Sequence, residues 1–384
     1  MKKTIAVLGA TGSVGTQALD VARIRGYDVE LISANSNEES AETLAREFMP
    51  KYLAMADEKA AESMKCRLAD TPIRVFAGEE GILESISLTT AQTVVNSIIG
   101  EAGLLPSLAV IDAGKRLALA NKESLVIAGD IVMKRAREKG IEILPVDSEH
   151  SAIFQSMKSG KHNEVKSILL TASGGPFFGK SRKELEAVTL EDTLAHPTWK
   201  MGKKITVDSA TLMNKGFEVV EAAHLFGVGT DRINVVVHRE SILHSAVEYI
   251  DNSIIGEFSV PDMRMCVQYA VDYPERCPGV GAELDLTAIG NLSFSKVDTE
   301  AFPLLPLAFS SYKKGGAMCA VMNAADEVAV AAFLSGRISF TDISDTVISV
   351  CDKMDDAKTC KTLDEIISAD RTARKIAAEY ISRL

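Results

Sequence analysis

The sequence predicts an α/β protein with an N-terminal Rossmann-type doubly wound parallel sheet, an α+β domain and a C-terminal helical bundle. Short apolar runs alternate with helical patterns up to about residue 147, which is typical of a parallel sheet covered by helices. Strands and helices mix between residues 148 and 272, and Ala-rich helical sequence follows residue 300. At 384 residues the chain is longer than a single core usually grows, so two or three domains are expected.

Six apolar runs of the first region are predicted strands: Thr4–Leu8, Val29–Ser33, Tyr52–Met55, Val94–Ile98, Arg116–Ala120 and Ile141–Val146. The first run follows Met1-Lys2-Lys3, but it is too short for the core of a signal peptide and leads directly into a glycine-rich turn. A helix is predicted from Ser124 to Lys139, because basic residues gather near its end and Gly140 follows.

Five strands are predicted in the second region: Ser167–Ala172, Ile205–Val207, Ile233–His238, Ile242–Tyr249 and Ile254–Ser259. A polar, glycine-bearing loop covers residues 173–204, and a connection of this length is usually a functional lid or a disordered segment. Residues 273–300 are rich in Pro and Gly and are predicted to form a linker. Helices of a bundle are then expected at Val321–Leu334, Asp342–Met354 and Leu363–Leu384.

The charge balance argues against a general polyanion binder. There are 53 acidic and 42 basic residues, so nucleic acid is not expected as a partner, although local cationic pockets for a small phosphate are compatible with this balance. No apolar stretch approaches the roughly 20 residues needed to cross a bilayer. The six cysteines lie far apart without a C-x-x-C pair, which favours a reducing cytoplasm over a disulfide framework or a zinc site.

The segment Gly9-Ala10-Thr11-Gly12-Ser13-Val14-Gly15 follows the first strand and opens a helix. Gly9 permits a tight turn, Gly12 lets the backbone approach a pyrophosphate, and Gly15 lets the helix pack close to the strand. A glycine-rich turn without a ligand is the alternative, but the position at the start of an alternating α/β pattern favours a dinucleotide site. The second strand ends in Ser33-Ala34-Asn35-Ser36-Asn37 rather than in an acidic residue, and these neutral donors favour the 2′-phosphate of NADPH.

Asp147-Ser148-Glu149 follows the strand at Ile141–Val146, and its spacing can point both carboxylates the same way. Two hard oxygen ligands suit Mg²⁺ or Mn²⁺, although a pair of solvated loop acids is the more frequent explanation for such a pair alone. A third acid, Glu218, shares a predicted helical face with Asn214 and Lys215. The alternative is an N-capped amphipathic surface helix, which explains Asp208 or Ser209 as a cap but not this alignment.

Three other segments contain side chains suited to a site. Ser173-Gly174-Gly175-Pro176 follows a strand and can hold an oxyanion with a hydroxyl and backbone N–H groups. His196-Pro197-Thr198-Trp199 places an imidazole and the single Trp in the long loop, where the indole is expected to close over a ligand; an ordinary surface histidine is the alternative. Asn121-Lys122-Glu123 also follows a strand, and a polar loop before a helix explains it about equally well.

Together these segments resemble the 1-deoxy-D-xylulose 5-phosphate reductoisomerase family over nearly the whole chain. The motifs that carry the resemblance are the Gly9–Gly15 turn, Asn121-Lys122-Glu123, residues 145–151, residues 173–177, residues 196–199 and residues 201–216. The resemblance implies that the chain makes 2-C-methyl-D-erythritol 4-phosphate, an isoprenoid precursor, from 1-deoxy-D-xylulose 5-phosphate. The substrate skeleton rearranges first, and the resulting aldehyde then accepts hydride from NADPH.

The resemblance also implies a role for each candidate residue. The implied metal ligands for Mg²⁺ or Mn²⁺ are Asp147, Glu149 and Glu218. The implied substrate-phosphate residues are Ser173, Ser209, Asn214 and Lys215. The implied catalytic residues are Lys122, Ser148, Glu149, His196 and Trp199, the last two in a flap at about 173–204. The implied NADPH contacts are Gly9, Thr11, Gly12, Ser13, Val14, Gly15, Ala34, Asn35, Ser36, Asn121, Glu123 and Gly202.

The pattern of strands, helices and linker described above gives the expected domain boundaries: an NADPH-binding domain at 1–147, a catalytic domain at 148–272, a linker at 273–300 and a bundle at 301–384. We also expect a cytoplasmic homodimer that acts on a small phosphorylated sugar, without a nucleic-acid or membrane partner.

The chain departs from the usual family sequence at three places. The family usually has a Gly together with a basic residue, Lys or Arg, and an Asn at the place where this chain has Ser33-Ala34-Asn35-Ser36. His238-Arg239-Glu240-Ser241 replaces His-Pro-Gln-Ser, and Asn323-Ala324-Ala325-Asp326-Glu327 replaces Asn-Ala-Ala-Asn-Glu. The last two departures are not expected to touch the catalytic set.

Two other functions are compatible with a dinucleotide fold. An NADP-dependent semialdehyde dehydrogenase begins with a similar turn but needs a mid-chain cysteine nucleophile, and no cysteine occurs between Cys66 and Cys266. A catalytically silent NADP-binding sensor would keep the fold but would have no need of three carboxylates.

Overall fold

The computed structural model describes residues 2–199 and 201–384. Contacts between Cα atoms divide the chain into two compact units. Among the described residues, unit 1 contains 2–124, 132–151 and 262–282, and unit 2 contains 125–131, 152–199, 201–261 and 283–384.

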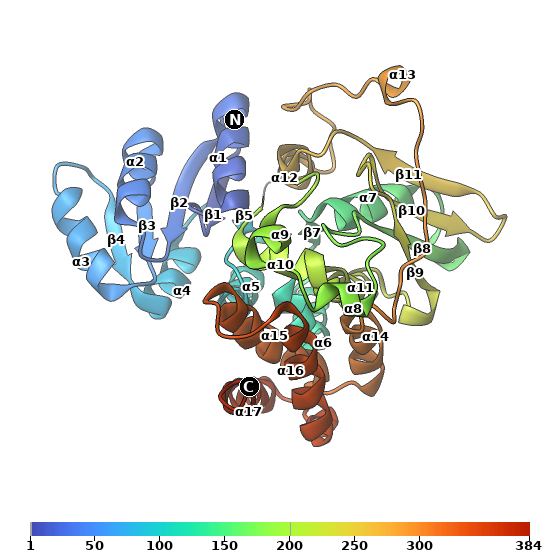
Figure 1. The fold of residues 1–384 in the computed structure, drawn as a ribbon. Coiled ribbons are helices and arrows are strands. Elements are labelled where there is room, and N and C mark those ends of the chain that lie inside the picture. Colours follow the sequence, from blue (N-terminus) through green and yellow to red (C-terminus); the bar gives the residue numbers. More distant parts are fainter. Residues whose placement is uncertain (1, 200) are drawn as a thin grey trace. The chain divides into compact units, whose positions relative to one another are not determined.

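Unit 1 is built on a seven-stranded parallel sheet in the order β4-β3-β2-β1-β5-β6-β7 (Figure 1). Its strands are β1 (Thr4–Leu8), β2 (Asp28–Ala34), β3 (Tyr52–Met55), β4 (Arg74–Ala77), β5 (Thr93–Asn96), β6 (Arg116–Leu119) and β7 (Ile143–Pro145). The order runs outward in both directions from β1, which places a topological switch point there. The doubly wound parallel sheet is therefore confirmed, with β4 as a strand that the apolar pattern did not predict.

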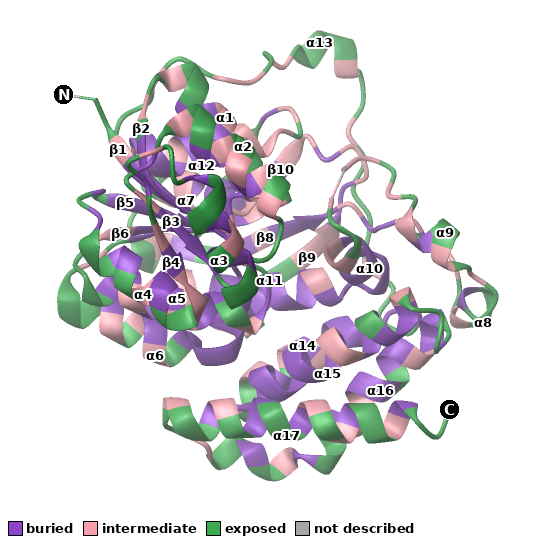
Figure 2. Ribbon diagram, turned by 90° about the vertical axis from the view of Figure 1, so that its left-hand side faces the viewer, coloured by how far each residue is buried: buried purple, intermediate pink, exposed green. Residues whose placement is uncertain are grey.

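Helices cover this sheet, and its strands are mostly buried, except for the edge strand β4, which is only partly buried (Figure 2). The helices that begin in unit 1 are α1 (Ser13–Arg25), α2 (Glu38–Phe48), α3 (Glu58–Arg67), α4 (Gly78–Leu88), α5 (Leu104–Asp112), α6 (Glu123–Lys139), α7 (Ser148–Ser156) and α12 (Met263–Asp272), with a 3₁₀ turn at Glu101–Gly103. Helix α6 ends at Gly140, whose φ of 65° is left-handed, as the sequence predicts. Helix α12 packs against α1, so unit 1 also includes a segment that follows the second sheet in the sequence.

Unit 2 contains a mixed four-stranded sheet in the order β11-β10-β8-β9. The strands are β8 (Val165–Ala172), β9 (Ile233–Val237), β10 (Leu243–Tyr249) and β11 (Ile254–Phe258). Strand β8 runs parallel to β9 and antiparallel to β10. Four of the five predicted strands of this region are confirmed, but the strand predicted at Ile205–Val207 is wrong. Those residues lie in helix α10 (Lys203–Thr211), and a short buried helix with β-branched residues cannot be told from a strand by its apolar pattern.

The long loop and the C-terminal region of unit 2 are mainly helical. The remaining helices are α8 (Arg182–Leu185), α9 (Leu190–Leu194), α11 (Met213–Phe226), α13 (Leu286–Ile289), α14 (Leu304–Lys314), α15 (Met318–Leu334), α16 (Phe340–Lys353) and α17 (Leu363–Ile381), with 3₁₀ turns at Met157–Ser159, His162–Glu164, Thr230–Arg232 and Asp355–Thr359. Helix α15 is mostly buried and packs against both α16 and α17. The predicted C-terminal bundle is therefore confirmed, and it supports α10 and α11 through contacts with α15 and α14.

The loop between β8 and α10 is ordered through much of its length. Capping boxes start its two short helices, one between Ser181 and Glu184 and one between Thr189 and Asp192. Arg182 also donates a 2.7 Å hydrogen bond to Ser344 Oγ on α16. The first half of this loop is therefore attached to the bundle.

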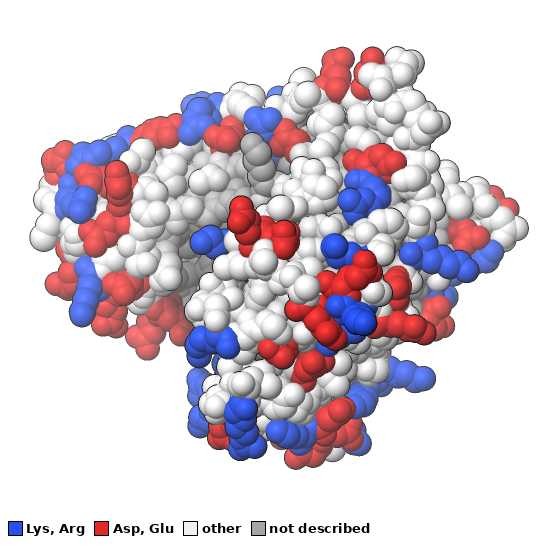
Figure 3. Space-filling model, viewed as in Figure 1, with Lys and Arg blue, Asp and Glu red and all other residues white. Residues whose placement is uncertain are grey.

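No helix among residues 2–199 and 201–384 is both long enough and apolar enough to span a membrane. Acidic and basic side chains are interspersed over the face shown in Figure 3.

Candidate functional site

The turn after β1 requires glycine at two positions. Gly9 has a φ of +74°, and a Cβ there would lie 2.7 Å from the Ser97 carbonyl oxygen. A Cβ on Gly15 would lie 2.2 Å from the Gly9 carbonyl oxygen, so only glycine lets α1 start against the turn. Gly12 is the N-cap of α1 and provides no side-chain cap. The first N–H groups of α1 are therefore suited to an anionic ligand.

The end of β2 lies beside this turn. Ser33 Oγ accepts a 3.1 Å hydrogen bond from Gly9 N, and Ala34 is buried. Asn37 Oδ1 caps α2 by accepting from Ser40 N at 3.1 Å. Asn35 and Ser36 are exposed between these two anchored residues, so they are the neutral side chains available at the place where a dinucleotide ribose is bound in this fold.

Asn121 holds the start of α6 in place. Its Nδ2 donates to the carbonyls of Ile98 (2.7 Å) and Gly100 (2.9 Å), and its Oδ1 accepts from Ser124 N (3.0 Å). Glu123 Oε2 lies 3.1 Å from the same amide. Asn121 therefore fixes the loop after β5, and its side-chain bonds join residues of unit 1.

Lys122 and Asp147 form an ion pair within unit 1, and both side chains are largely buried. Asp147 also starts α7, because its Oδ1 accepts from Ser148 N at 3.0 Å and its carbonyl accepts from Ser151 N at 2.8 Å. Ser148 Oγ donates to the Glu149 carboxylate. The motifs after β6 and β7 thus meet, as expected for neighbouring parallel strands.

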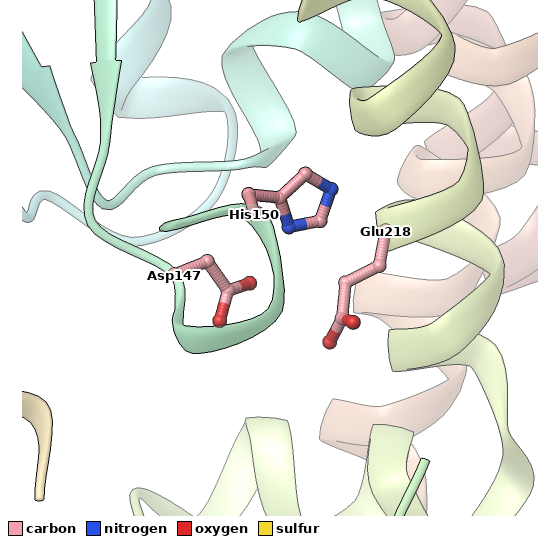
Figure 4. A group of neighbouring side chains, drawn as sticks. All are labelled: Asp147, His150 and Glu218. Carbon is pink, nitrogen blue, oxygen red and sulfur yellow. The ribbon is translucent and has the colours of Figure 1, made fainter. Parts of the chain in front are cut away.

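His150 is a further candidate ligand, which the sequence pattern did not single out. It is completely buried, and one of its ring nitrogens lies within 4.8 Å of an Asp147 carboxylate oxygen. Figure 4 shows the Asp147 and His150 side chains at the start of α7; the third labelled side chain, Glu218, comes from α11 of unit 2. The missed signal is the i, i+3 spacing from Asp147, which places both side chains on one side of a helical turn.

Helix α11 gathers the polar residues predicted on one face. Asn214 Nδ2 donates to Glu218 Oε1 at 2.5 Å, and Lys215 forms an ion pair with the same carboxylate. Lys215 and Glu218 are 4% and 1% exposed, so this array lies in the interior of unit 2. The alternative of a surface helix capped by Asp208 or Ser209 is therefore wrong. Both residues lie inside α10, whose N-cap is Gly202.

The turn after β8 packs against α10. Gly174 and Gly175 both have left-handed φ values, +77° and +64°, and a Cβ on Gly175 would lie 2.6 Å from the Ser209 carbonyl oxygen. Ser173 Oγ lies 3.0 Å from His196 Nε2. The structure therefore brings Ser173, the glycine turn and α10 together with the His196 segment.

His196 is held as a neutral imidazole. Its Nδ1 accepts backbone N–H bonds from Thr198 (3.2 Å) and Trp199 (2.9 Å), so its proton is on Nε2 and is donated to Ser173 Oγ. Burial, with a smaller contribution from the charge of Arg239, lowers the pKa of His196 to about 4. The Trp199 ring lies 6.0 Å from the ring of His244, centroid to centroid.

One of the two departures in unit 2 reaches Ser173, a residue of the implied phosphate set, whereas the expectation concerned the catalytic set. Arg239 Nη1 donates to the carbonyls of Gly175 (2.9 Å) and Ser173 (3.4 Å). Because Ala172 and Val237 are partners in the parallel β8–β9 pair, the segments after both strands leave the same sheet edge. The contact of Arg239 with the glycine turn therefore follows from the β8–β9 pairing, which the local sequence does not reveal.

Asp326 is connected to the candidate phosphate residues through Lys204 and Asp208. It is completely buried on α15 and lies 3.0 Å from Lys204 Nζ, which also pairs with Asp208 on α10. Asp208 in turn precedes Ser209 in the sequence.

The comparisons with known proteins agree over the whole chain. The family profile described as 1-deoxy-D-xylulose 5-phosphate reductoisomerase matches residues 5–129, and C-terminal domain profiles of the same enzyme match residues 143–226 and 258–376. The reductoisomerase of Acetivibrio thermocellus is 50% identical over 99% of this chain and 100% of its own length. That of Caldanaerobacter subterraneus is 48% identical, with the same coverage of both chains.

Solved structures give the same result. The Zymomonas mobilis enzyme in complex with NADPH is 39% identical, covers 100% of both chains and has a TM-score of 0.91. A DOX-P reductoisomerase in complex with NADPH, fosmidomycin and magnesium is 37% identical, covers 99% of this chain and 98% of its own, and has a TM-score of 0.94.

Proposed function

Because the chain belongs to the 1-deoxy-D-xylulose 5-phosphate reductoisomerase family, we propose that it converts 1-deoxy-D-xylulose 5-phosphate to 2-C-methyl-D-erythritol 4-phosphate with NADPH. The observation that carries the proposal is the buried array on α11, where an amide, an ammonium and a carboxylate lie together. Such an array suits a phosphate on the cationic side and a metal ion on the acidic side. Relatives solved with NADPH and magnesium support this assignment.

NADPH fits the turn after β1. The crowded backbone at Gly9 and Gly15 and the N-terminus of α1 suit a pyrophosphate, which Thr11, Ser13 and Val14 would also contact. The exposed Asn35 and Ser36, beside the buried Ala34, would take the 2′-phosphate. The same assignment places Asn121, Glu123 and Gly202 near the cofactor. Bound NADPH supplies the hydride for the reductive step.

The proposed metal ligands are Asp147, Glu149 and Glu218. Their donor atoms are hard carboxylate oxygens, which fit Mg²⁺ or Mn²⁺. His150 adds an imidazole beside Asp147, whereas Glu149 is not among the grouped side chains, so its assignment rests on the family resemblance. A bound divalent cation supplies Lewis-acid polarisation of the substrate ketone.

Residues of the chain would hold the substrate at both ends. Ser173, Ser209, Asn214 and Lys215 bind the phosphate, and Ser173 is suited to donate its hydroxyl proton because its oxygen already faces the His196 N–H. At the other end, Lys122 and Ser148 contact the hydroxyl and carbonyl groups. Holding both ends fixes the reacting carbons, and the segment with His196 and Trp199 excludes water from them.

We further propose a homodimer and a reducing, cytoplasmic location. Strand β11 is an edge of the unit 2 sheet and exposes Ile254 (57%) and Phe258 (45%), which suits pairing with a second copy. Each of the six cysteines is a free thiol. Light scattering on the unaltered chain and on Phe258→Glu tests the dimer, and a monomer in both samples would contradict it.

The proposed activity is tested by following NADPH oxidation with 1-deoxy-D-xylulose 5-phosphate, with and without Mg²⁺ or Mn²⁺. Turnover should require the metal, and Glu218→Gln should lower it by at least about 100-fold, since even neighbours of a ligand contribute 10–100-fold. Glu379→Gln, at an exposed position of α17, is the matched control. Turnover that survives stringent chelation would refute the metal assignment. NADPH binding without turnover would instead favour the sensor.

A further inference from the structure

We propose that Arg239 is a positioning residue for the substrate phosphate, acting through the Ser173–Gly175 turn and the His196 imidazole. The inference rests on the proposed function and deepens it, because it assigns a role to a residue outside the implied phosphate set. All of its residues lie in unit 2.

Arg239 joins two segments that are far apart in the sequence. Its Nη1 donates to the Gly175 carbonyl at 2.9 Å and to the Ser173 carbonyl at 3.4 Å. Its guanidinium carbon lies 5.2 Å from the centre of the Phe178 ring, so the aromatic face also holds the side chain. The Arg239 carbonyl oxygen lies 3.5 Å from Thr198 Oγ1, in the segment with His196. One residue therefore contacts both the glycine turn and the flap.

The carbonyl contacts determine which way the turn presents its N–H groups. In a trans peptide the C=O and N–H bonds point in opposite directions. The Ser173 carbonyl faces the guanidinium, so the N–H of Gly174 points away from Arg239. Left-handed φ values at Gly174 and Gly175 complete this conformation, in which the backbone N–H can donate to an oxyanion.

Arg239 also favours the protonation state of His196 that suits phosphate binding. The neutral ring donates from Nε2 to Ser173 Oγ, and Gly175 N donates to the same oxygen at 3.3 Å. With its oxygen accepting from two N–H groups, the Ser173 hydroxyl proton is directed elsewhere, to a phosphate oxygen in the proposed complex. A second proton on His196 is disfavoured by burial and by the positive charge of Arg239.

The test compares Arg239→Met, Arg239→Lys and the unaltered enzyme. Charge-assisted hydrogen bonds of this kind support an expected rise of roughly 10-fold in KM for 1-deoxy-D-xylulose 5-phosphate in Arg239→Met, with kcat within about threefold. The inhibition constant of inorganic phosphate should rise by the same factor, while KM for NADPH stays unchanged. Arg239→Lys should recover part of the loss because it keeps the charge. A general folding defect would move all of these constants together.

Arg232→Met is the matched control, because Arg232 also donates to a backbone carbonyl of unit 2, that of Val165 at 3.1 Å, but at the opposite end of β8 from Ser173. It should leave KM and phosphate inhibition unchanged. If Arg239→Met does not fold, as shown by its thermal melt, Arg239→Gln takes its place, and unchanged phosphate inhibition in that variant overturns the inference. Equal KM and equal phosphate inhibition in Arg239→Met and the unaltered enzyme overturn it as well.

A separate measurement distinguishes failure of this inference from failure of the proposed function. Trp199 is the single Trp of the chain and lies in the His196 segment, so its fluorescence reports inorganic phosphate binding without turnover. If the unaltered chain binds phosphate but does not turn over the sugar phosphate, the proposed function fails while the role of Arg239 is still measured. If phosphate affinity is the same with and without Arg239, the inference fails even though turnover is found.

Discussion

The Lys122 ammonium pairs with the Asp147 carboxylate in the interior of unit 1, so a residue proposed to contact substrate neutralises one proposed to bind metal. In Lys122→Met we expect Mn²⁺ to bind several-fold more tightly, because the competing cation is gone. We expect kcat/KM to fall at least about 100-fold, because a buried charged contact to the substrate is lost. Calorimetry with Mn²⁺ and the NADPH oxidation assay measure the two effects.

Lys115→Met is the control for this experiment. Lys115 is another lysine of unit 1, donating to the Thr89 and Ala91 carbonyls, and its removal should leave Mn²⁺ affinity unchanged. If Mn²⁺ binds more weakly in Lys122→Met but not in Lys115→Met, the Lys122 ammonium organises the carboxylates rather than competing with the metal ion for them.

The exposed Ser36 provides a test of cofactor choice. At equal concentrations the unaltered enzyme should use NADPH more efficiently than NADH. Ser36→Asp should lower kcat/KM for NADPH by roughly 10-fold and leave that for NADH unchanged, because the new carboxylate repels the 2′-phosphate. Ser87→Asp, at an exposed position of α4, controls for added charge. Equal efficiency of the two cofactors in the unaltered enzyme would refute the interpretation of Asn35 and Ser36.

Glu30 is expected to stabilise unit 1 through its charge. Its side chain is 4% exposed, and it accepts hydrogen bonds from Thr90 N (2.6 Å) and Ala91 N (3.0 Å) and pairs with Lys51. Burial alone would raise its pKa, but the hydrogen bonds, led by that of Lys51, lower the pKa to about 2. Glu30→Gln should therefore cost about 3 kcal/mol of unfolding free energy at pH 7.

The loss of stability in Glu30→Gln should depend on pH. A carboxylate with a depressed pKa stabilises the fold above its unfolded pKa, so the difference between Glu30→Gln and the unaltered protein should shrink between pH 4.5 and about 2. Urea unfolding at several pH values measures it. Glu84→Gln, which removes an exposed partner of Arg74, should change stability little. A pH-independent difference would show that shape, not charge, explains the loss.

Asp326 should have the opposite pH dependence. Burial raises its pKa even though Lys204 opposes the shift. The folded state then binds the proton more tightly than the unfolded chain, so this residue makes the fold less stable as pH rises above about 4. Asp326→Asn should raise Tm by roughly 2–4 °C at pH 8 and by less at pH 5. Calorimetry measures Tm, with Asp352→Asn at an exposed position of α16 as the control. A lowered Tm of Asp326→Asn at pH 8 would mean that Lys204 needs the carboxylates of both Asp208 and Asp326.

Local patterns predicted much of the fold because they report burial and turn chemistry directly. Alternating apolar runs located most strands of both sheets, and Gly140 marked the end of α6. Strand β4 was missed because Arg74-Val75-Phe76-Ala77 is short and only partly buried. Helix α10 was misassigned because Thr206 to Thr211 are all buried, which removes the polar face that identifies a helix.

Side-chain contacts between distant segments were less predictable. The Asn214, Lys215 and Glu218 array follows from helical spacing, so the sequence predicted it correctly. The contact of Arg239 with the glycine turn depends on the pairing of β8 with β9, whose partner residues are 65 positions apart in the sequence, as Ala172 and Val237 are. Strand pairing of this kind is set by tertiary packing, and a single sequence contains no local signal for it.

Because the long loop is attached to α16, residues of the bundle help to hold a loop that is proposed to cover the substrate. Arg182 bonds to Ser344 and to Asp345, both at 2.7 Å, and the Phe177 ring meets that of Phe340 at 5.0 Å, a few residues from the glycine turn. A substitution of Ser344 or Asp345 is therefore expected to loosen the loop that leads to His196 and, on the proposed function, to lower turnover. Positions 182 and 345 should covary among related enzymes, because the Arg182 guanidinium bonds directly to the Asp345 carboxylate.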